Sequence, residues 1–176
     1  MTEQATIARQ PWQDDVYDAL KAAGIGIVSY VPDAGHARTI ARAIGDPDME
    51  AIVLTTEEEG VALGYGAWLG GQKAVLLMQS SGVGNCINML GLVQSCRFPF
   101  LALVTMRGEW EEFNPWQEPM GRAVPAVLDA MAIDVRRADT PEDARDLTLR
   151  GAEDAFNGDN GIAILFSQKL IGAKVW

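Results

Sequence analysis

Three consecutive glutamates, Glu57, Glu58 and Glu59, are the residues whose type and spacing are best suited to chemistry. They follow a short apolar run, 51–54, typical of a buried strand, and they open a stretch of apolar and small residues that predicts a helix over 57–70. Ligands of parallel α/β sheets bind in the crevice outside the carboxyl ends of the strands. A carboxylate half withdrawn from water there favours its protonated form and could share a proton with a ligand nitrogen. The pattern therefore predicts an acid/base site at the start of this helix.

The same glutamates also have a purely structural explanation. Thr56 could cap the helix and Glu59 could complete a capping box. Three carboxylates in a first turn also suit the positive end of the helix dipole. Spacing alone favours this capping interpretation, so both hypotheses stay open. Because the helix is almost entirely apolar or small from Val61 to Gly71, we expect it to be buried.

Apolar runs and turn signals divide the chain into alternating strands and helices. The predicted strands cover 25–31, 51–55, 73–78, 100–105, 132–136 and 162–166. The predicted helices cover 11–23, 36–45, 57–70, a segment that follows 79–85 and ends at Cys96, 122–131 and 141–156. Six strands alternating with helices predict an α/β protein with a three-layer α/β/α doubly wound fold and a mostly parallel sheet.

The length of 176 residues predicts one domain, with a core over about 12–166, an N-terminal extension over 1–10 and a tail over 167–176. The formal net charge of −10 argues against nucleic acid and anionic membrane surfaces as partners, because both need a basic patch. No apolar run approaches the roughly 18 residues of a membrane span, and the N-terminus lacks the apolar segment of a secretory signal.

The two cysteines, Cys86 and Cys96, predict neither a disulfide nor a metal site. They fall on one predicted helix, roughly 15 Å apart, which is beyond disulfide reach. Two lone thiols also match no zinc spacing. We therefore expect a reduced, cytoplasmic protein without metal ligands of its own.

Further candidates follow other predicted strands. Gly82-Val83-Gly84-Asn85 could bring backbone N–H groups against a ligand, although two glycines at a strand-to-helix turn are more often plain turn chemistry. The third glycine of a dinucleotide fingerprint is missing. His36, the only histidine, follows the first strand and is either a cap, a surface group or a functional side chain.

Arg107 follows the fourth predicted strand and could clamp an oxyanion; the alternative is a surface ion pair. The loop 106–120 is near the length limit of a structureless connection. Its Trp110, Phe113 and Trp116 are more apolar than a solvated loop requires. They predict a lid or a partner interface.

Together these pieces resemble the pyrimidine-binding (Pyr) domain of thiamine diphosphate-dependent 2-oxoacid decarboxylases. The likeness covers about residues 12–166 and is strongest to the α subunit of sulfopyruvate decarboxylase and the matching part of phosphonopyruvate decarboxylase. It is carried by Val31-Pro32-Asp33, Glu57 with Gly66 nine residues later, Gln79 to Asn85, Asn88, Arg107-Gly108-Glu109, Glu118 to Arg122 and Val127 to Met131.

The resemblance implies that Glu57 is the catalytic glutamate, which hydrogen-bonds the N1′ nitrogen of the cofactor's aminopyrimidine ring. It implies a cofactor-binding set of Pro32, Glu57, Gln79, Ser81, Gly82, Gly84 and Asn85. It also implies a substrate-binding set of Asp33, His36, Arg107 and Arg122. The family differs from this sequence at His36, where many relatives carry a small or hydroxyl side chain.

The implied reaction is decarboxylation of an anionic 2-oxoacid, most directly sulfopyruvate to sulfoacetaldehyde and CO2. The sequence has no Gly-Asp-Gly…Asn motif, so the resemblance implies that a separate β subunit, carrying a diphosphate-binding (PP) domain, holds the diphosphate and Mg²⁺. We therefore expect a homo- or hetero-oligomer. The alternatives are a phosphonopyruvate decarboxylase or other thiamine diphosphate lyase subunit, and a non-catalytic doubly wound domain in which Glu57 only caps its helix.

Overall fold

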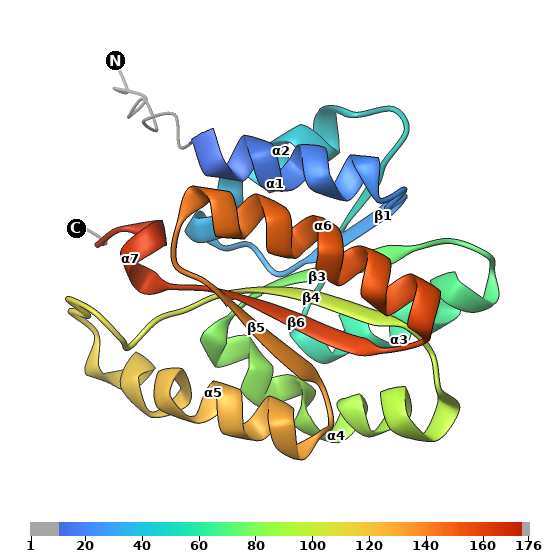
Figure 1. Ribbon diagram of the computed structural model, residues 1–176. Helices are drawn as coiled ribbons and strands as arrows, with labels where there is room; N and C mark the ends of the chain where they lie inside the picture. The colour runs from blue at the N-terminus through green and yellow to red at the C-terminus, as the bar shows by residue number, and fades with distance from the viewer. Residues whose placement is uncertain (1–10, 174–176) are drawn as a thin grey trace.

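Six parallel strands form one sheet in the computed structural model, which describes residues 11–173 (Figure 1). In chain order the strands are β1 (Ile27–Tyr30), β2 (Glu50–Val53), β3 (Ala74–Gln79), β4 (Phe100–Thr105), β5 (Asp134–Ala138) and β6 (Gly161–Phe166). Their order across the sheet is β2-β1-β3-β4-β6-β5, and every neighbouring pair is parallel. The predicted doubly wound α/β fold is confirmed.

Helices cover both faces of this sheet (Figure 1). One layer contains α1 (Pro11–Ala22), α2 (Ala37–Gly45) and α6 (Pro141–Gly158), and the other contains α3 (Glu57–Leu69), α4 (Ser80–Cys96) and α5 (Glu118–Ala130). Two 3₁₀ turns and a short last helix complete the chain: η1 (Ala34–His36), η2 (Pro115–Gln117) and α7 (Gln168–Ile171).

The core consists of two apolar layers, one on each face of the sheet. All residues of β4 and β6 are buried, which explains why these central strands are near-continuous apolar runs. Leu77, Leu103 and Ile164 face the α1/α6 layer, while Leu76, Ala102 and Leu165 face the α3/α4 layer. Because all six strands are parallel, their carboxyl ends lie together at one edge of the sheet.

Three local expectations are corrected by the structure. The segment 79–85 is not a loop, because α4 begins at Ser80 directly after β3. The expected capping box is also absent: the Thr56 side chain makes no capping hydrogen bond, and Glu59 accepts from the backbone N–H of Thr55 instead (2.8 Å). Finally, α3 is buried mainly at its first turn, and Leu69 near its end is 71% exposed.

At its C-terminal end, the described part of the chain contains more structure than a tail. Residues 167–176 were expected as a tail, yet α7 lies there, with Gln168 buried and Leu170 packed against the core. The predicted extension 1–10 lies outside the described residues. Between residues 11 and 173, no helix combines the length and the apolar character needed to cross a bilayer.

Candidate functional site

Glu57 is the first residue of α3 and is only 8% exposed, whereas Glu58 and Glu59 are exposed. Its Oε2 accepts a hydrogen bond from Asn85 Nδ2 of α4 at 2.7 Å. On the other side, a Cβ added to Gly82 would lie 2.4 Å from Glu57 Oε1, so only glycine lets the carboxylate lie this close to α4. The structure thus singles out one of the three glutamates and brings it together with Gly82 and Asn85.

A second group of side chains joins the carboxyl ends of β1, β3 and β4. The Asp33 carboxylate accepts hydrogen bonds from Gly35 N (3.0 Å), Gln79 Nε2 (3.0 Å) and Thr105 Oγ1 (2.7 Å). Ser81 Oγ in turn donates to Gln79 Oε1 at 3.1 Å. The structure therefore brings three of the predicted site residues into one network. Sequence reasoning missed Thr105, whose one available signal was a hydroxyl at the end of an apolar strand.

His36 lies beneath this network and is almost fully buried. Its Nε2 lies 3.0 Å from the Leu103 carbonyl oxygen and 3.3 Å from that of Met78, so Nε2 must carry the proton and donate to both. Burial lowers the pKa of His36, which keeps the ring neutral. In this arrangement the imidazole braces the turn after β1, and its predicted contact with a substrate stays a prediction.

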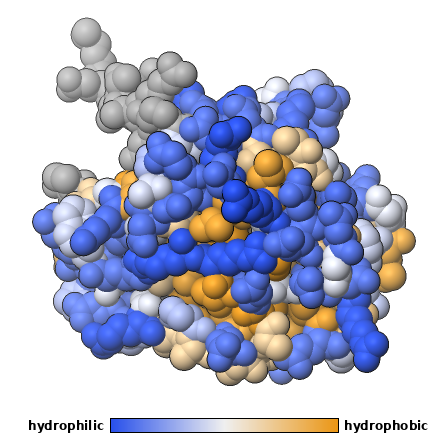
Figure 2. Space-filling view, in the orientation of Figure 1, coloured by the Kyte–Doolittle hydropathy of each residue, from blue (hydrophilic) through white to orange (hydrophobic). Residues whose placement is uncertain are grey.

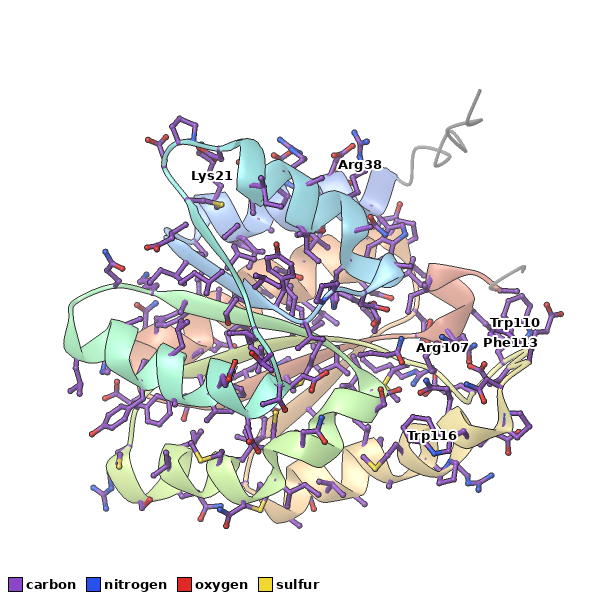
Figure 3. The ribbon with its side chains drawn as sticks, turned by 180° about the vertical axis from the view of Figure 1, so that it is seen from behind. Lys21, Arg38, Arg107, Trp110, Phe113 and Trp116 are labelled. Atoms are coloured by element: carbon purple, nitrogen blue, oxygen red, sulfur yellow. The ribbon has the colours of Figure 1, made fainter. Side chains whose placement is uncertain are left out.

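Arg107 forms a third, separate network at the same edge (Figure 3). Its guanidinium pairs with both carboxylate oxygens of Glu112, with a distance of 2.7 Å from Nε to Oε2. Gln168 Nε2 also donates to Glu112 Oε2 at 2.9 Å. The hydrogen bonds from Arg107 are the main reason that the pKa of Glu112 falls to about 2. Arg107 is therefore buried against a full counter-charge.

The loop between β4 and α5 is held by hydrogen bonds to Gln168 and carries exposed apolar side chains. Gln168 Oε1 accepts from the backbone N–H groups of Glu109 (2.9 Å) and Trp110 (3.0 Å). Figure 3 shows Trp110 and Phe113 beside Arg107 at this end of the molecule, with Trp116 at the start of the following helix. Trp116 is 73% exposed. Gln168, lying some 60 residues from the loop, had no signal in the sequence.

The remaining predicted residues lie at the rim. The Arg122 side chain on α5 is 70% exposed, and its nearest acidic oxygen is Glu118 Oε2 at 3.4 Å. Pro32 is exposed and borders an apolar hollow of about 410 Å³ beside α2. Gly84 lies one turn into α4, facing Met120. Within residues 11–173, no group of three or more His, Cys, Asp or Glu side chains is arranged to hold a metal ion.

These features define a doubly wound α/β domain with a buried, partly hydrogen-bonded glutamate at the carboxyl edge of its sheet. No protein-family model matches the chain. The chain is 36% identical over 151 residues to the sulfopyruvate decarboxylase α subunit of Methanococcus maripaludis, and the match covers 85% of this chain and 90% of that protein. It is 35% identical over 117 residues to the phosphonopyruvate decarboxylase of Streptomyces viridochromogenes, covering 65% of this chain and 30% of that protein.

The chain belongs to the family of sulfopyruvate decarboxylase α subunits, and the resemblance drawn from its motifs is confirmed. Its named relatives are decarboxylases, that is, carboxy-lyases. Among solved structures, it resembles the 2-oxoglutarate:ferredoxin oxidoreductase from Magnetococcus marinus with a TM-score of 0.72 and 17% identity, over 91% of this chain and 29% of that one. That likeness supports the fold.

Proposed function

We propose that this chain is the pyrimidine-binding α subunit of a thiamine diphosphate-dependent decarboxylase that acts on an anionic 2-oxoacid, most directly sulfopyruvate. The observation that carries the proposal is Glu57, buried at the start of α3, whose carboxylate accepts a hydrogen bond from Asn85 alone within residues 11–173. Its second oxygen, Oε1, is thus available to share a proton with a ring nitrogen. Family membership supports the substrate.

The residues present fit an aminopyrimidine ring. Glu57 Oε1 has no hydrogen bond within residues 11–173, and Gln79 with Ser81 places an amide and a hydroxyl at the same edge. When bound, thiamine diphosphate would supply the electron sink for the loss of CO2. This chain's share is to bind and orient the ring through Pro32, Glu57, Gln79, Ser81, Gly82, Gly84 and Asn85. We assign the diphosphate and Mg²⁺ to the PP domain of the β subunit.

An anionic substrate needs a local positive charge, because the chain carries a net charge of −10. We propose Arg122 and Arg107 as its sources and Asp33 and His36 as the residues that shape the substrate side. Arg122 is exposed, whereas Arg107 is neutralised by Glu112. Arg122 is therefore the better placed of the two.

Exposed apolar side chains support a partner subunit. The large ones lie on α2, β2, α3, α4 and the loop before α5: Ile44, Val53, Leu69, Ile87, Phe113 and Trp116. By contrast, hydrophilic side chains predominate on the face with α1 and α6 (Figure 2). We therefore propose that the surface with Leu69, Ile87 and the aromatic loop before α5 contacts the β subunit and that the isolated chain self-associates. A clean monomer at micromolar concentration in analytical ultracentrifugation would count against this.

We propose that the assembly acts in the cytoplasm, because Cys86 and Cys96 are free thiols.

The deciding experiment is reconstitution with a β subunit that carries the Gly-Asp-Gly…Asn motif, followed by aldehyde-release assays on sulfopyruvate and phosphonopyruvate. We expect turnover that needs both chains and thiamine diphosphate, with sulfopyruvate preferred. Preference for phosphonopyruvate would move the chain toward its Streptomyces relative. No turnover of either, with both chains associated and thiamine diphosphate bound, would favour a non-catalytic binding domain.

A further inference from the structure

The link between Asn85 and Glu57 is the one hydrogen bond in residues 11–173 that reaches the Glu57 carboxylate. It connects the first turn of α3 with the second turn of α4, 28 residues further along the chain. The motif resemblance assigns Asn85 to the cofactor. In the structure, however, its amide contacts the carboxylate itself.

The other groups around Glu57 do not hydrogen-bond its carboxylate in residues 11–173. Gly82 closes one side of the carboxylate without offering a side chain. The nearby Cys86 thiol is directed at Met78 Sδ at 3.9 Å, and burial raises its pKa to about 12, so it stays neutral. No other side chain in residues 11–173 donates a hydrogen bond that fixes the orientation of the Glu57 carboxylate.

We propose that Asn85 is a positioning residue for Glu57. Its amide N–H holds Oε2 and so fixes the orientation of the carboxylate, which leaves Oε1, beside Gly82, without a hydrogen bond in residues 11–173 and able to accept one from a ligand. The inference rests on the proposed function only in naming that ligand the aminopyrimidine ring. Loss of the amide would leave the Glu57 carboxylate free to rotate away from this orientation.

Other charged and titratable groups near Glu57 could also influence its carboxylate. On α3 they are Glu58 and Glu59, and on α4 the Cys86 thiol. None of them changes when Asn85 is replaced. A change in the Glu57 carboxyl resonance can therefore be assigned to the amide.

The first test is ¹³C NMR of the glutamate side-chain carboxyls in the full-length chain near neutral pH, with Glu57→Gln used to assign the resonance. We expect Asn85→Ala to move the Glu57 carboxyl resonance, because the carboxylate loses its hydrogen-bond donor. Asn85→Asp should move it as well, because an acceptor replaces the donor. Asn88→Ala, an exposed asparagine one turn along the same helix, should leave it unchanged. Equal values in Asn85→Ala and wild type would overturn the proposal.

The second test separates this inference from the proposed function. In the reconstituted enzyme, Asn85→Ala should lower kcat by about 10-fold and leave KM within about twofold. If Glu57→Gln retains full activity, the catalytic role of Glu57 fails, whereas the NMR measurement still decides the Asn85 contact. If Glu57→Gln is inactive and Asn85→Ala matches wild type in kcat, the positioning role alone is wrong.

Discussion

Two buried glutamates at the same edge of the sheet, Glu57 and Glu112, have opposite hydrogen-bonding environments. The Glu112 side chain, 4% exposed, accepts from both sides of the Arg107 guanidinium, from Gln168 Nε2 and from the backbone N–H groups of Gly108 and Asn114. Glu57 accepts from Asn85 alone among residues 11–173. Both side chains are buried, but Glu57 keeps one oxygen without a donor, whereas both oxygens of Glu112 accept hydrogen bonds.

The difference separates a carboxylate whose oxygens both accept hydrogen bonds from one that keeps an oxygen without a donor. A carboxylate with five donors is held ionised, which agrees with the low pKa of Glu112. It fixes the loop that carries the exposed aromatic side chains. A carboxylate with one donor keeps an oxygen free for a ligand. We therefore expect Arg107 mainly to hold the loop through Glu112, and its contact with a substrate stays a prediction.

The largest effect is expected from removing the ion pair between Arg107 and Glu112. Arg107→Ala leaves Glu112 buried without its counter-ion, which should cost about 3–5 kcal/mol of unfolding free energy. Denaturant unfolding followed by circular dichroism measures this cost. The double variant Arg107→Met/Glu112→Leu serves as the control and should recover only part of the loss: no charge is left unpaired, but Gln168 Nε2 and the N–H groups of Gly108 and Asn114 lose their acceptor.

A different result would reassign Arg107. If Arg107→Ala keeps wild-type stability while KM for sulfopyruvate rises by about 10- to 100-fold, the guanidinium serves the substrate rather than the loop.

Replacing Glu57 should abolish catalysis without preventing folding. Glu57→Gln fits the same space but cannot share a proton with a ring nitrogen, so activity should fall by at least about 100-fold with little change in stability. Hydrogen–deuterium exchange at C2 of bound thiamine diphosphate measures the proton-transfer step apart from substrate binding. Glu58→Gln and Glu59→Gln are the controls, and equal exchange rates in all three variants would return Glu57 to a capping role.

Much of the fold could be predicted because the central strands are unbroken apolar runs. The expected bounds of β4, 100–105, are those observed, and β3 and β6 differ by one residue at most. The start of α4 was missed, because Ser-Ser-Gly-Val-Gly is typical of turns. Packing of Gly82 against Glu57 outweighs that local preference. Likewise, an apolar α3 suggested burial, although composition cannot distinguish a core helix from one at an interface.

The candidate site could be located from the sequence but not resolved into roles. Motif order placed Glu57 and Arg107 at the carboxyl edge, because each follows a strand. Nothing in spacing distinguishes a glutamate with one donor from one with five. Thr105 and Gln168 contribute single polar groups from distant parts of the chain, so no local pattern marks them.

Arg122 offers a sharper test of where the substrate's charge is met. Its guanidinium is exposed and only loosely placed near Glu118, so its loss should leave stability within about 0.5 kcal/mol. If Arg122 supplies the local charge, Arg122→Ala raises KM by about 10- to 100-fold with kcat little changed. Steady-state kinetics of the reconstituted enzyme checks this. Wild-type KM in both arginine variants would place the charge on the partner subunit.

The smallest effect concerns the glycine that lets Glu57 lie against α4. A methyl group at Gly82 would meet the Glu57 carboxylate, so Gly82→Ala should cost about 1–3 kcal/mol of stability and displace Oε1. Gly84→Ala is the matched control, since its Cβ would only touch Met120 Sδ at 3.4 Å. Alanine there should be neutral or stabilising by up to about 1 kcal/mol, because it is the better helix former. Equal unfolding free energies for the two variants would show that the carboxylate is not held against the helix, and the distinction between Glu57 and Glu112 would then rest on hydrogen bonding alone.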